Sequence, residues 1–140
     1  IAEKTGADLS IVSEMLDIRN RELAEVTRAD DFIVSDRLVS LMMSQLAENK
    51  RLGPVFGDLF DPEGSELYLK PASDYVETGR AISFYTVVEC ARRRGEVAIG
   101  YRLGADAGDA TKSYGVRVNP CKSERITFAE GDRVIVLAES

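Results

Sequence analysis

The sequence predicts an α/β segment over residues 1–60, followed by a small α+β domain over residues 61–140. In the first segment, short apolar runs alternate with helix-forming stretches, which is the order of a parallel α/β sheet. The turn "DPEG" at residues 61–64 then marks a change of character. Beyond it, several short strands and one helix are joined by short loops, which favours antiparallel pairing. Two strands make a poor sheet, so the first segment is expected to be the end of a larger one.

In the first segment, residues 10–16 ("SIVSEML") and 30–35 ("DDFIVS") are expected to form strands. Residues 17–26 and 36–49 consist of good helix formers and are expected to form helices. Gly53 is expected to end the second helix in a left-handed conformation, and Pro54 to begin a further helix.

The helix over residues 36–49 is apolar around more of its circumference than packing on one body requires. Two interpretations stay open: both helices fill a monomer core, or they form a helix-turn-helix that pairs with a second subunit. Fully burying each apolar side chain contributes roughly 1.5–3 kcal/mol, so a chain that exposed several would associate. The expected interface residues are Leu38, Leu41, Met42, Leu46, Val55, Phe56, Leu59 and Phe60.

The second domain is expected to contain strands at residues 65–71, 96–104, 114–120 and 133–139, with a helix from a Ser83 cap to Gly95. Near the end of the chain, Gly131 is expected to supply a positive φ, and Asp132 to bond back to nearby amides. Alternation predicts that Ile126, Phe128, Val134 and Val136 face the core.

Composition excludes several classes of function. The net charge is -6, which argues against a nucleic-acid partner because phosphate binding requires a basic face. The run Arg92-Arg93-Arg94 is instead expected at a helix C-terminus. Histidine is absent, two cysteines show no metal spacing, and no glycine-rich phosphate motif occurs, so no catalytic or metal site is expected. No apolar stretch approaches the ~20 residues that span a bilayer. A cytoplasmic protein that is not an enzyme is therefore expected.

Four residues are candidates for contact with a small ligand or ion. Glu14 lies inside an apolar strand, where a carboxylate is costly unless it lies at the edge of the sheet that binds ligands. Tyr101, Arg102 and Asn119 could face a small polar ligand, although an exposed strand edge and a turn also account for them. The other acidic clusters are typical of turns and helix caps.

Residues 10–43, "EVAIGYRL", the "VNP" turn and "FAEGDRVIVLA" together resemble an RCK domain (regulator of potassium conductance). The first stretch is similar to the end of the nucleotide-binding lobe, and the others to the smaller TrkA-C lobe. "DLFDPEGSELYLKPASDYV", residues 58–76, is most similar to the CASTOR/POLLUX ion-channel group and its bacterial relatives.

The resemblance implies a regulatory module at the cytosolic face of a membrane complex. Such modules pair through crossover helices into homodimers or higher rings, below a pore domain or transporter subunit. The crossover would be the two helices described above. No cofactor is implied for this segment, since the nucleotide-binding glycines would precede Ile1. A nucleotide or cation would instead bind in the longer protein. Glu14 matches an acidic position of calcium-gated relatives, but Leu16 stands where a second carboxylate is expected.

The sequence thus predicts a ligand-sensing gating module of an ion channel or potassium transporter, acting by dimerisation and conformational switching. The alternative is the C-terminal fragment of a nicotinamide-dependent oxidoreductase whose fingerprint lies upstream. A third interpretation is a free-standing sensor that works with a separate transporter subunit.

Overall fold

The computed structural model describes residues 12–15, 31–61 and 63–139, and only the backbone of residues 12–15 and 31–37. The chain divides into two compact units, Ile1–Val55 and Phe56–Ser140. The helix expected at residues 17–26 lies outside the described residues. The independence of residues 61–140 as a domain stays a prediction.

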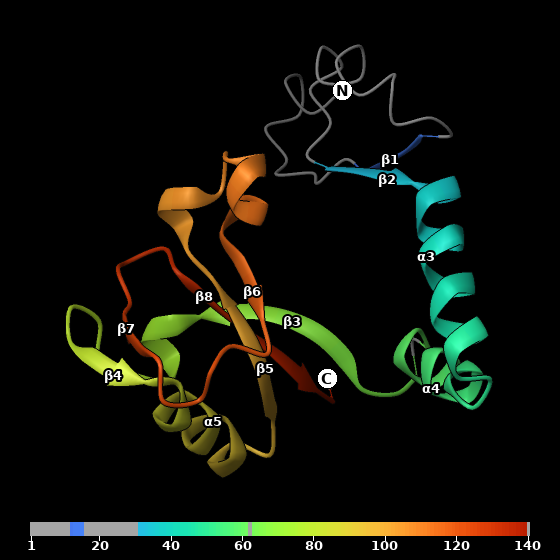
Figure 1. Cartoon of the computed structure of the whole chain (residues 1–140). Helices are drawn as coiled ribbons and strands as arrows, with labels where there is room; N and C mark the ends of the chain where they lie inside the picture. Colours follow the sequence, from blue (N-terminus) through green and yellow to red (C-terminus); the bar gives the residue numbers. More distant parts are fainter. Residues whose placement is uncertain (1–11, 16–30, 62, 140) are drawn as a thin grey trace, which may run out of the picture. The chain divides into compact units, whose positions relative to one another are not determined.

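In the first unit, β1 (Val12–Met15) pairs in parallel with β2 (Asp31–Val34), with Val12 opposite Asp31. The helix α3 (Ser35–Glu48) follows β2 directly and leads toward α4 (Leu52–Leu59) (Figure 1). The two parallel strands followed by a helix confirm the predicted α/β order.

Gly53 does not end α3, so that expectation is wrong. Gly53 and Pro54 both lie in the first turn of α4, and Gly53 has no positive φ. Asn49 closes the connection instead: its backbone carbonyl accepts from the Leu52 amide at 3.1 Å, and its side-chain oxygen accepts from the Arg51 amide at 3.1 Å. An asparagine that bonds its own backbone two residues on is a known alternative to a glycine turn.

The second unit is built on a four-stranded antiparallel sheet in the order β3-β8-β5-β6 (Figure 1). The strands are β3 (Glu66–Pro71), β5 (Val97–Arg102), β6 (Val116–Val118) and β8 (Arg133–Ala138). All their pairings are antiparallel, as expected from the short loops. The predicted fold class, α/β followed by a mostly antiparallel α+β region, is confirmed.

A second, two-stranded sheet pairs β4 (Ala81–Ser83) with β7 (Arg125–Thr127), and the sequence had not predicted either strand. The helix α5 (Phe84–Arg93) follows β4, with Ser83 at its N-cap and Gly95 beyond its end at φ 76°. Arg92 and Arg93 lie in its last turn, as predicted from the negative end of the helix dipole. Three short 3-10 segments complete the unit: η2 (Ala72–Asp74), η3 (Gly104–Asp106) and η4 (Ala110–Gly115).

The core of the second unit lies between α5 and one face of the four-stranded sheet. Phe84, Val87 and Ala91 of α5 are fully buried there. The four residues predicted to face the core, Ile126, Phe128, Val134 and Val136, all belong to the same cluster.

The turn before β8 is held as predicted, and by more than its own residues. Gly131 has φ 94°. Asp132 is only 5% exposed, and its carboxylate accepts from the Ala129 amide at 2.8 Å and from the Gly104 amide at 2.7 Å. The second bond joins this turn to η3.

Candidate functional site

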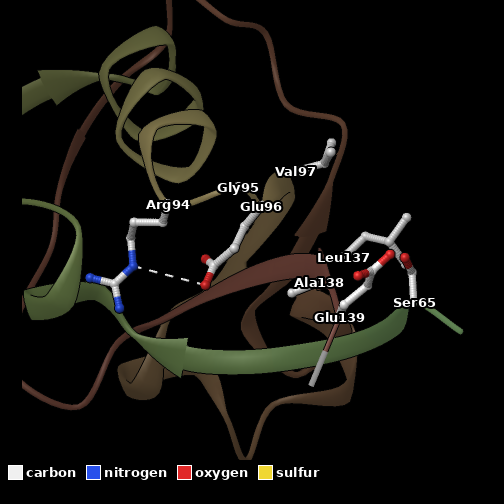
Figure 2. A pocket seen from close by; sticks show the side chains of 8 residues that line it. All are labelled: Ser65, Arg94, Gly95, Glu96, Val97, Leu137, Ala138 and Glu139. Atoms are coloured by element: carbon white, nitrogen blue, oxygen red, sulfur yellow. Dashed lines mark ion pairs between the residues drawn. The ribbon is translucent and has the colours of Figure 1, made fainter.

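The end of the four-stranded sheet near the C-terminus of α5 carries a pocket of about 390 Å³ (Figure 2). Its lining comes from the residue before β3, from the connection between α5 and β5, and from the end of β8. The lining residues are Ser65, Arg94, Gly95, Glu96, Val97, Leu137, Ala138 and Glu139.

Local sequence explains how the charged groups reach this pocket. The helix α5 ends at Arg93, and Gly95 adopts φ 76°, which a residue with a Cβ rarely tolerates. The chain reverses there into β5, so that Arg94 and Glu96 stand on either side of the turn, as Figure 2 shows. Val97 is then opposite Leu137 of β8, which places two aliphatic side chains beside the charges.

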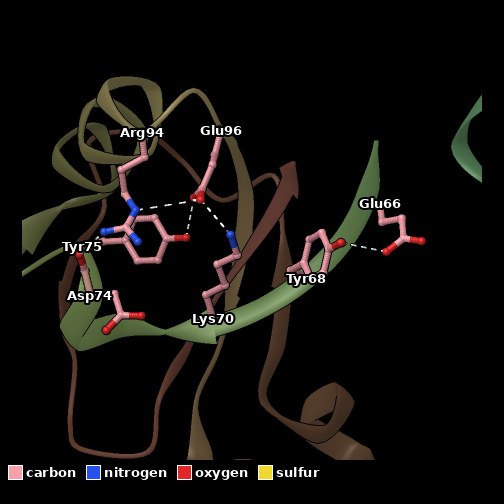
Figure 3. A network of polar contacts seen from close by, with 7 residues as sticks. All are labelled: Glu66, Tyr68, Lys70, Asp74, Tyr75, Arg94 and Glu96. Atoms are coloured by element: carbon pink, nitrogen blue, oxygen red, sulfur yellow. Dashed lines mark hydrogen bonds and ion pairs between the residues drawn. The ribbon is translucent and has the colours of Figure 1, made fainter. Parts of the chain in front are cut away.

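Glu96 is the centre of a network of polar contacts (Figure 3). Its side chain is 9% exposed; Lys70 Nζ lies 2.7 Å from Oε1, and the Tyr75 hydroxyl donates to Oε2 at 2.5 Å. Arg94 Nε lies 3.8 Å from Oε1, and its guanidinium stacks 5.0 Å from the Tyr75 ring centre. Arg94 also donates to the Asp74 carbonyl at 3.2 Å. The network ties β3, η2 and the start of β5 together.

Burial and these contacts set the protonation states. Burial of Glu96 acts to raise its pKa, but the hydrogen bonds from Lys70 and Tyr75 outweigh it, and the pKa is lowered. Burial, and then the hydrogen bond to Glu96, raises the pKa of Tyr75. The pair therefore consists of an ionised carboxylate and a neutral phenol at neutral pH, and Tyr75 is the donor.

The lining favours a small polar ligand. It contributes the charges of Arg94, Glu96 and Glu139, but Glu96 is already paired with Lys70 and Arg94, so Glu139 is the lining carboxylate left without an ion-pair partner in the described part of the chain. The Ser65 hydroxyl adds a further donor and acceptor. Within the described ranges, no group of three or more acidic or cysteine side chains is placed to hold a metal ion. The arrangement therefore suits reversible binding of a solvated ligand better than a dedicated metal cage.

The structure places the predicted ligand residues in separate surroundings. Tyr101 is 2% exposed, with its ring 5.7 Å from that of Phe128. Arg102 is half-buried and donates from Nε to the Tyr114 carbonyl at 3.3 Å. Asn119 is exposed at φ 51°, and its side-chain oxygen accepts from Lys122 at 2.8 Å. Glu14 is opposite Ile33 in the β1–β2 pair, and its side chain lies outside the described residues. Their ligand roles stay predictions.

Sequence reasoning missed Arg94, Glu96 and Glu139 as pocket residues. One signal was present: Lys70 interrupts a strand on the same face as Tyr68, where an apolar residue is the norm. A lone charge on the core face requires a partner of opposite sign, and Glu96 supplies it from 26 residues further on.

The residues predicted for the interface lie on α3 and α4 or directly beyond α4, and several are open to solvent. Leu38, Leu41, Val55 and Phe60 are exposed, while Met42, Leu46, Phe56 and Leu59 are half-buried. Two further apolar residues of α3 are exposed, Val39 and Met43, and Met43 is 65% exposed. The Phe56 and Phe60 rings stack with centres 6.5 Å apart.

None of the helices in the described ranges has the length and apolarity required to cross a bilayer. No protein-family model matches the sequence.

The sequence is similar to several plant ion channels. It is 36% identical over 136 residues to a probable ion channel POLLUX of Arabidopsis thaliana; the aligned region covers 96% of this chain and 16% of that protein. It is 33% identical over 129 residues to the ion channel CASTOR of Lotus japonicus, covering 92% and 14%. It is 41% identical over 93 residues to the ion channel DMI1 of Medicago truncatula, covering 66% and 10%.

Two solved structures of the GsuK channel, one of them bound to NAD, align with 99% of this chain and 22% of theirs. Both are 12% identical to it, with TM-scores of 0.41 and 0.43.

Proposed function

We propose that this chain, which belongs to the CASTOR and POLLUX family of ion channels, is an RCK-type segment. In this proposal it is the ligand-sensing part of a channel's gating apparatus. It spans 14 to 16% of the length of those two relatives, so the proposal concerns a regulatory segment and not the pore. Copies of the segment associate through α3 and α4, and a ligand that favours one arrangement of the copies shifts the gating equilibrium. The pore is part of the same complex, and the segment lies at the cytosolic face of the membrane.

The apolar surface of α3 and α4 carries this proposal. In the described part of the chain, Leu38, Val39, Leu41 and Met43 of α3 are each about half exposed or more, as are Val55 and Phe60. A helix that carries so much apolar surface in water is typical of a segment that packs on another body. Fully burying each of these side chains would contribute roughly 1.5–3 kcal/mol, which is enough in sum to hold a dimer.

Sedimentation velocity over a concentration series tests the association. Met43→Asp with Val55→Asp is expected to abolish the dimer without unfolding the monomer, because both side chains are exposed. Tyr85→Asp is the matched control, since Tyr85 is equally exposed, at 61%, but lies on α5. A native chain that stays monomeric, or a control as disruptive as the double variant, would refute the assignment.

The pocket beside Glu96 is the proposed ligand site. A thermal-shift screen with Ca²⁺, K⁺, NAD⁺ and ATP tests it, because a ligand present at 100 times its Kd raises the free energy of unfolding by about 2.7 kcal/mol. Glu139→Gln is expected to remove the shift, and Glu77→Gln, on an exposed ion pair elsewhere, is expected to keep it. A shift that survives Glu139→Gln would move the ligand to another site.

The relatives reported above are named as ion channels and none as an enzyme. These similarities favour the gating segment over the oxidoreductase alternative.

A further inference from the structure

The four-stranded sheet has two faces, and only one of them is covered by the core of the second unit. On β3 and β8 the even-numbered residues face the core, and the odd-numbered residues face away from it. The outward face carries aliphatic side chains on every strand of the sheet (strand order in Figure 1). Those that are 49 to 62% exposed are Leu67, Leu69, Val97 and Val118. Between them lie two residues of β8, the half-buried Leu137 and Ile135, which these neighbours leave 8% exposed.

Strand register arranges these residues in rows across the sheet. Leu67, Leu137 and Val97 form one row, because Leu137 is opposite both of the others. The adjacent row runs from Leu69 through Ile135 to Gly100 and Val118. Only glycine fits at position 100, because a Cβ there would lie 2.2 Å from the Arg117 carbonyl oxygen. Gly100 therefore leaves a gap between the side chains of that row. The result is a broad apolar strip with a shallow middle.

Charges of opposite sign flank the strip. At one end, Arg102 of β5 is directly opposite Arg133 of β8, and neither has an ion-pair partner in the described part of the chain. Two like charges opposite one another destabilise a sheet unless an anion lies nearby. At the other end, the alternation of β8 places Glu139 on the outward face, and Glu139 lines the pocket together with Val97 and Leu137. Glu139 also lacks an ion-pair partner among these residues.

Along β8 the outward residues are therefore Arg133, Ile135, Leu137 and Glu139, in that order. This order is self-complementary about its midpoint. A two-fold axis between Ile135 and Leu137 brings the arginine of one copy opposite the glutamate of the other at both ends. It also brings Ile135 opposite Leu137. A symmetric dimer uses the same patch on both subunits and requires this property.

We propose that the outward face of this sheet docks on the same face of a second copy of the chain, with Arg133 of each copy paired to Glu139 of the other. Two sheets packed face to face lie about 10 Å apart with their strands nearly aligned, a spacing that aliphatic side chains fill. This interface differs from the α3–α4 surface. A chain with both surfaces extends a dimer into a larger assembly, because each copy then meets two neighbours.

Charge reversal tests the pairing. The Met43→Asp, Val55→Asp chain serves as the background, so that association through the helices is removed. In that background, Arg133→Glu places two glutamates together at each end, and Glu139→Arg places two arginines together. Each is expected to weaken self-association at least about tenfold, since like charges in an interface disfavour it. Arg80→Glu is the control, because Arg80 lies in an exposed ion pair remote from the sheet face.

Mixing the two charge-reversed chains in equal amounts gives the decisive result. Each end of the mixed dimer then joins a glutamate to an arginine, so association measured by sedimentation velocity is expected to return to the background level. A mixture that stays dissociated, or single variants that associate as the background does, would overturn the proposal. A monomeric background would also overturn it, and would leave the helix interface untouched.

Inorganic phosphate tests whether Arg102 and Arg133 bind an anion instead. A thermal shift with phosphate that is lost in Arg133→Glu, without self-association of the chain, would assign the arginine pair to anion binding and overturn the proposal.

Discussion

Tyr75 donates a 2.5 Å hydrogen bond to Glu96, and this contact joins the turn after β3 to the residue that precedes β5. Lys70 holds the other carboxylate oxygen of Glu96 at 2.7 Å (Figure 3). Lys70 and Tyr75 thus both bond the carboxylate of Glu96, which follows them in sequence by 26 and 21 residues and lies beside the pocket. The strongest effects of substitution in the second unit are expected at this network and at the two backbone turns described below.

Glu96→Gln is expected to destabilise the chain by about 1–3 kcal/mol at pH 7, because Lys70 loses its counter-charge in a partly buried site. The folded-state pKa of Glu96 lies below its ordinary value of 4.5, so its ionisation stabilises the fold above that value. This contribution disappears as the pH falls through the folded-state pKa. Urea unfolding at pH 7 and at successively lower pH should therefore show the difference between native and variant chains shrinking on acidification.

Glu89→Gln is the control for this experiment. Glu89 bonds Arg92 and Arg93 on the solvent side of α5, and these hydrogen bonds lower its pKa to about 2. Exposed ion pairs contribute little to stability, so the variant should unfold at nearly the native urea concentration. If Glu96→Gln changed the midpoint no more than this control does, the network would not stabilise the fold.

Asp132→Ala is expected to cost more than Asp132→Asn. The alanine leaves the Gly104 and Ala129 amides without their acceptor, which is 5% exposed, at about 1–3 kcal/mol for each of these hydrogen bonds to a carboxylate. Asparagine keeps one acceptor oxygen and should retain part of the stability. Thermal unfolding of both variants measures the difference; equal losses would mean that the negative charge, rather than the number of acceptors, holds the turn.

Gly115→Ala is expected to be more damaging than Gly131→Ala. Both glycines have positive φ, 77° and 94°. A Cβ at Gly115 would lie 2.3 Å from the Leu103 carbonyl oxygen, whereas nothing lies within 4 Å at Gly131. The second variant should therefore lose only the backbone penalty of about 1 kcal/mol. Denaturation of the two variants side by side checks the order, and equal losses would show that the close contact relaxes freely.

The sequence predicted most elements of the fold because their signals are local. The helix at residues 36–49 follows from its run of helix formers, and the parallel pair from two short apolar runs separated by a helix-forming stretch. The alternation on either side of Gly131 correctly placed Ile126, Phe128, Val134 and Val136 in the core. The strands β4 and β7 were missed because each has three residues and pairs only with the other, 44 positions away. Such short strands carry too few residues for a periodic pattern.

The candidate site could not be predicted from the sequence, for a different reason. Its charged groups meet only after the sheet forms, since Lys70 and Glu96 are 26 residues apart. Tyr101 resembled a ligand-facing residue in sequence, but the structure packs its ring between Phe84 and Phe128. A single sequence shows which side chains are charged or aromatic, but it does not show which of them the fold brings together.

In the proposed gating segment, ligand binding and self-association are coupled, so the association constant should differ with and without ligand. Sedimentation equilibrium of the native chain should be run alone and with whichever of Ca²⁺, K⁺, NAD⁺ or ATP raises its melting temperature. We expect a change of about 5-fold or more in the association constant, and no change in Glu139→Gln. A ligand that binds and leaves the association constant unchanged would contradict it.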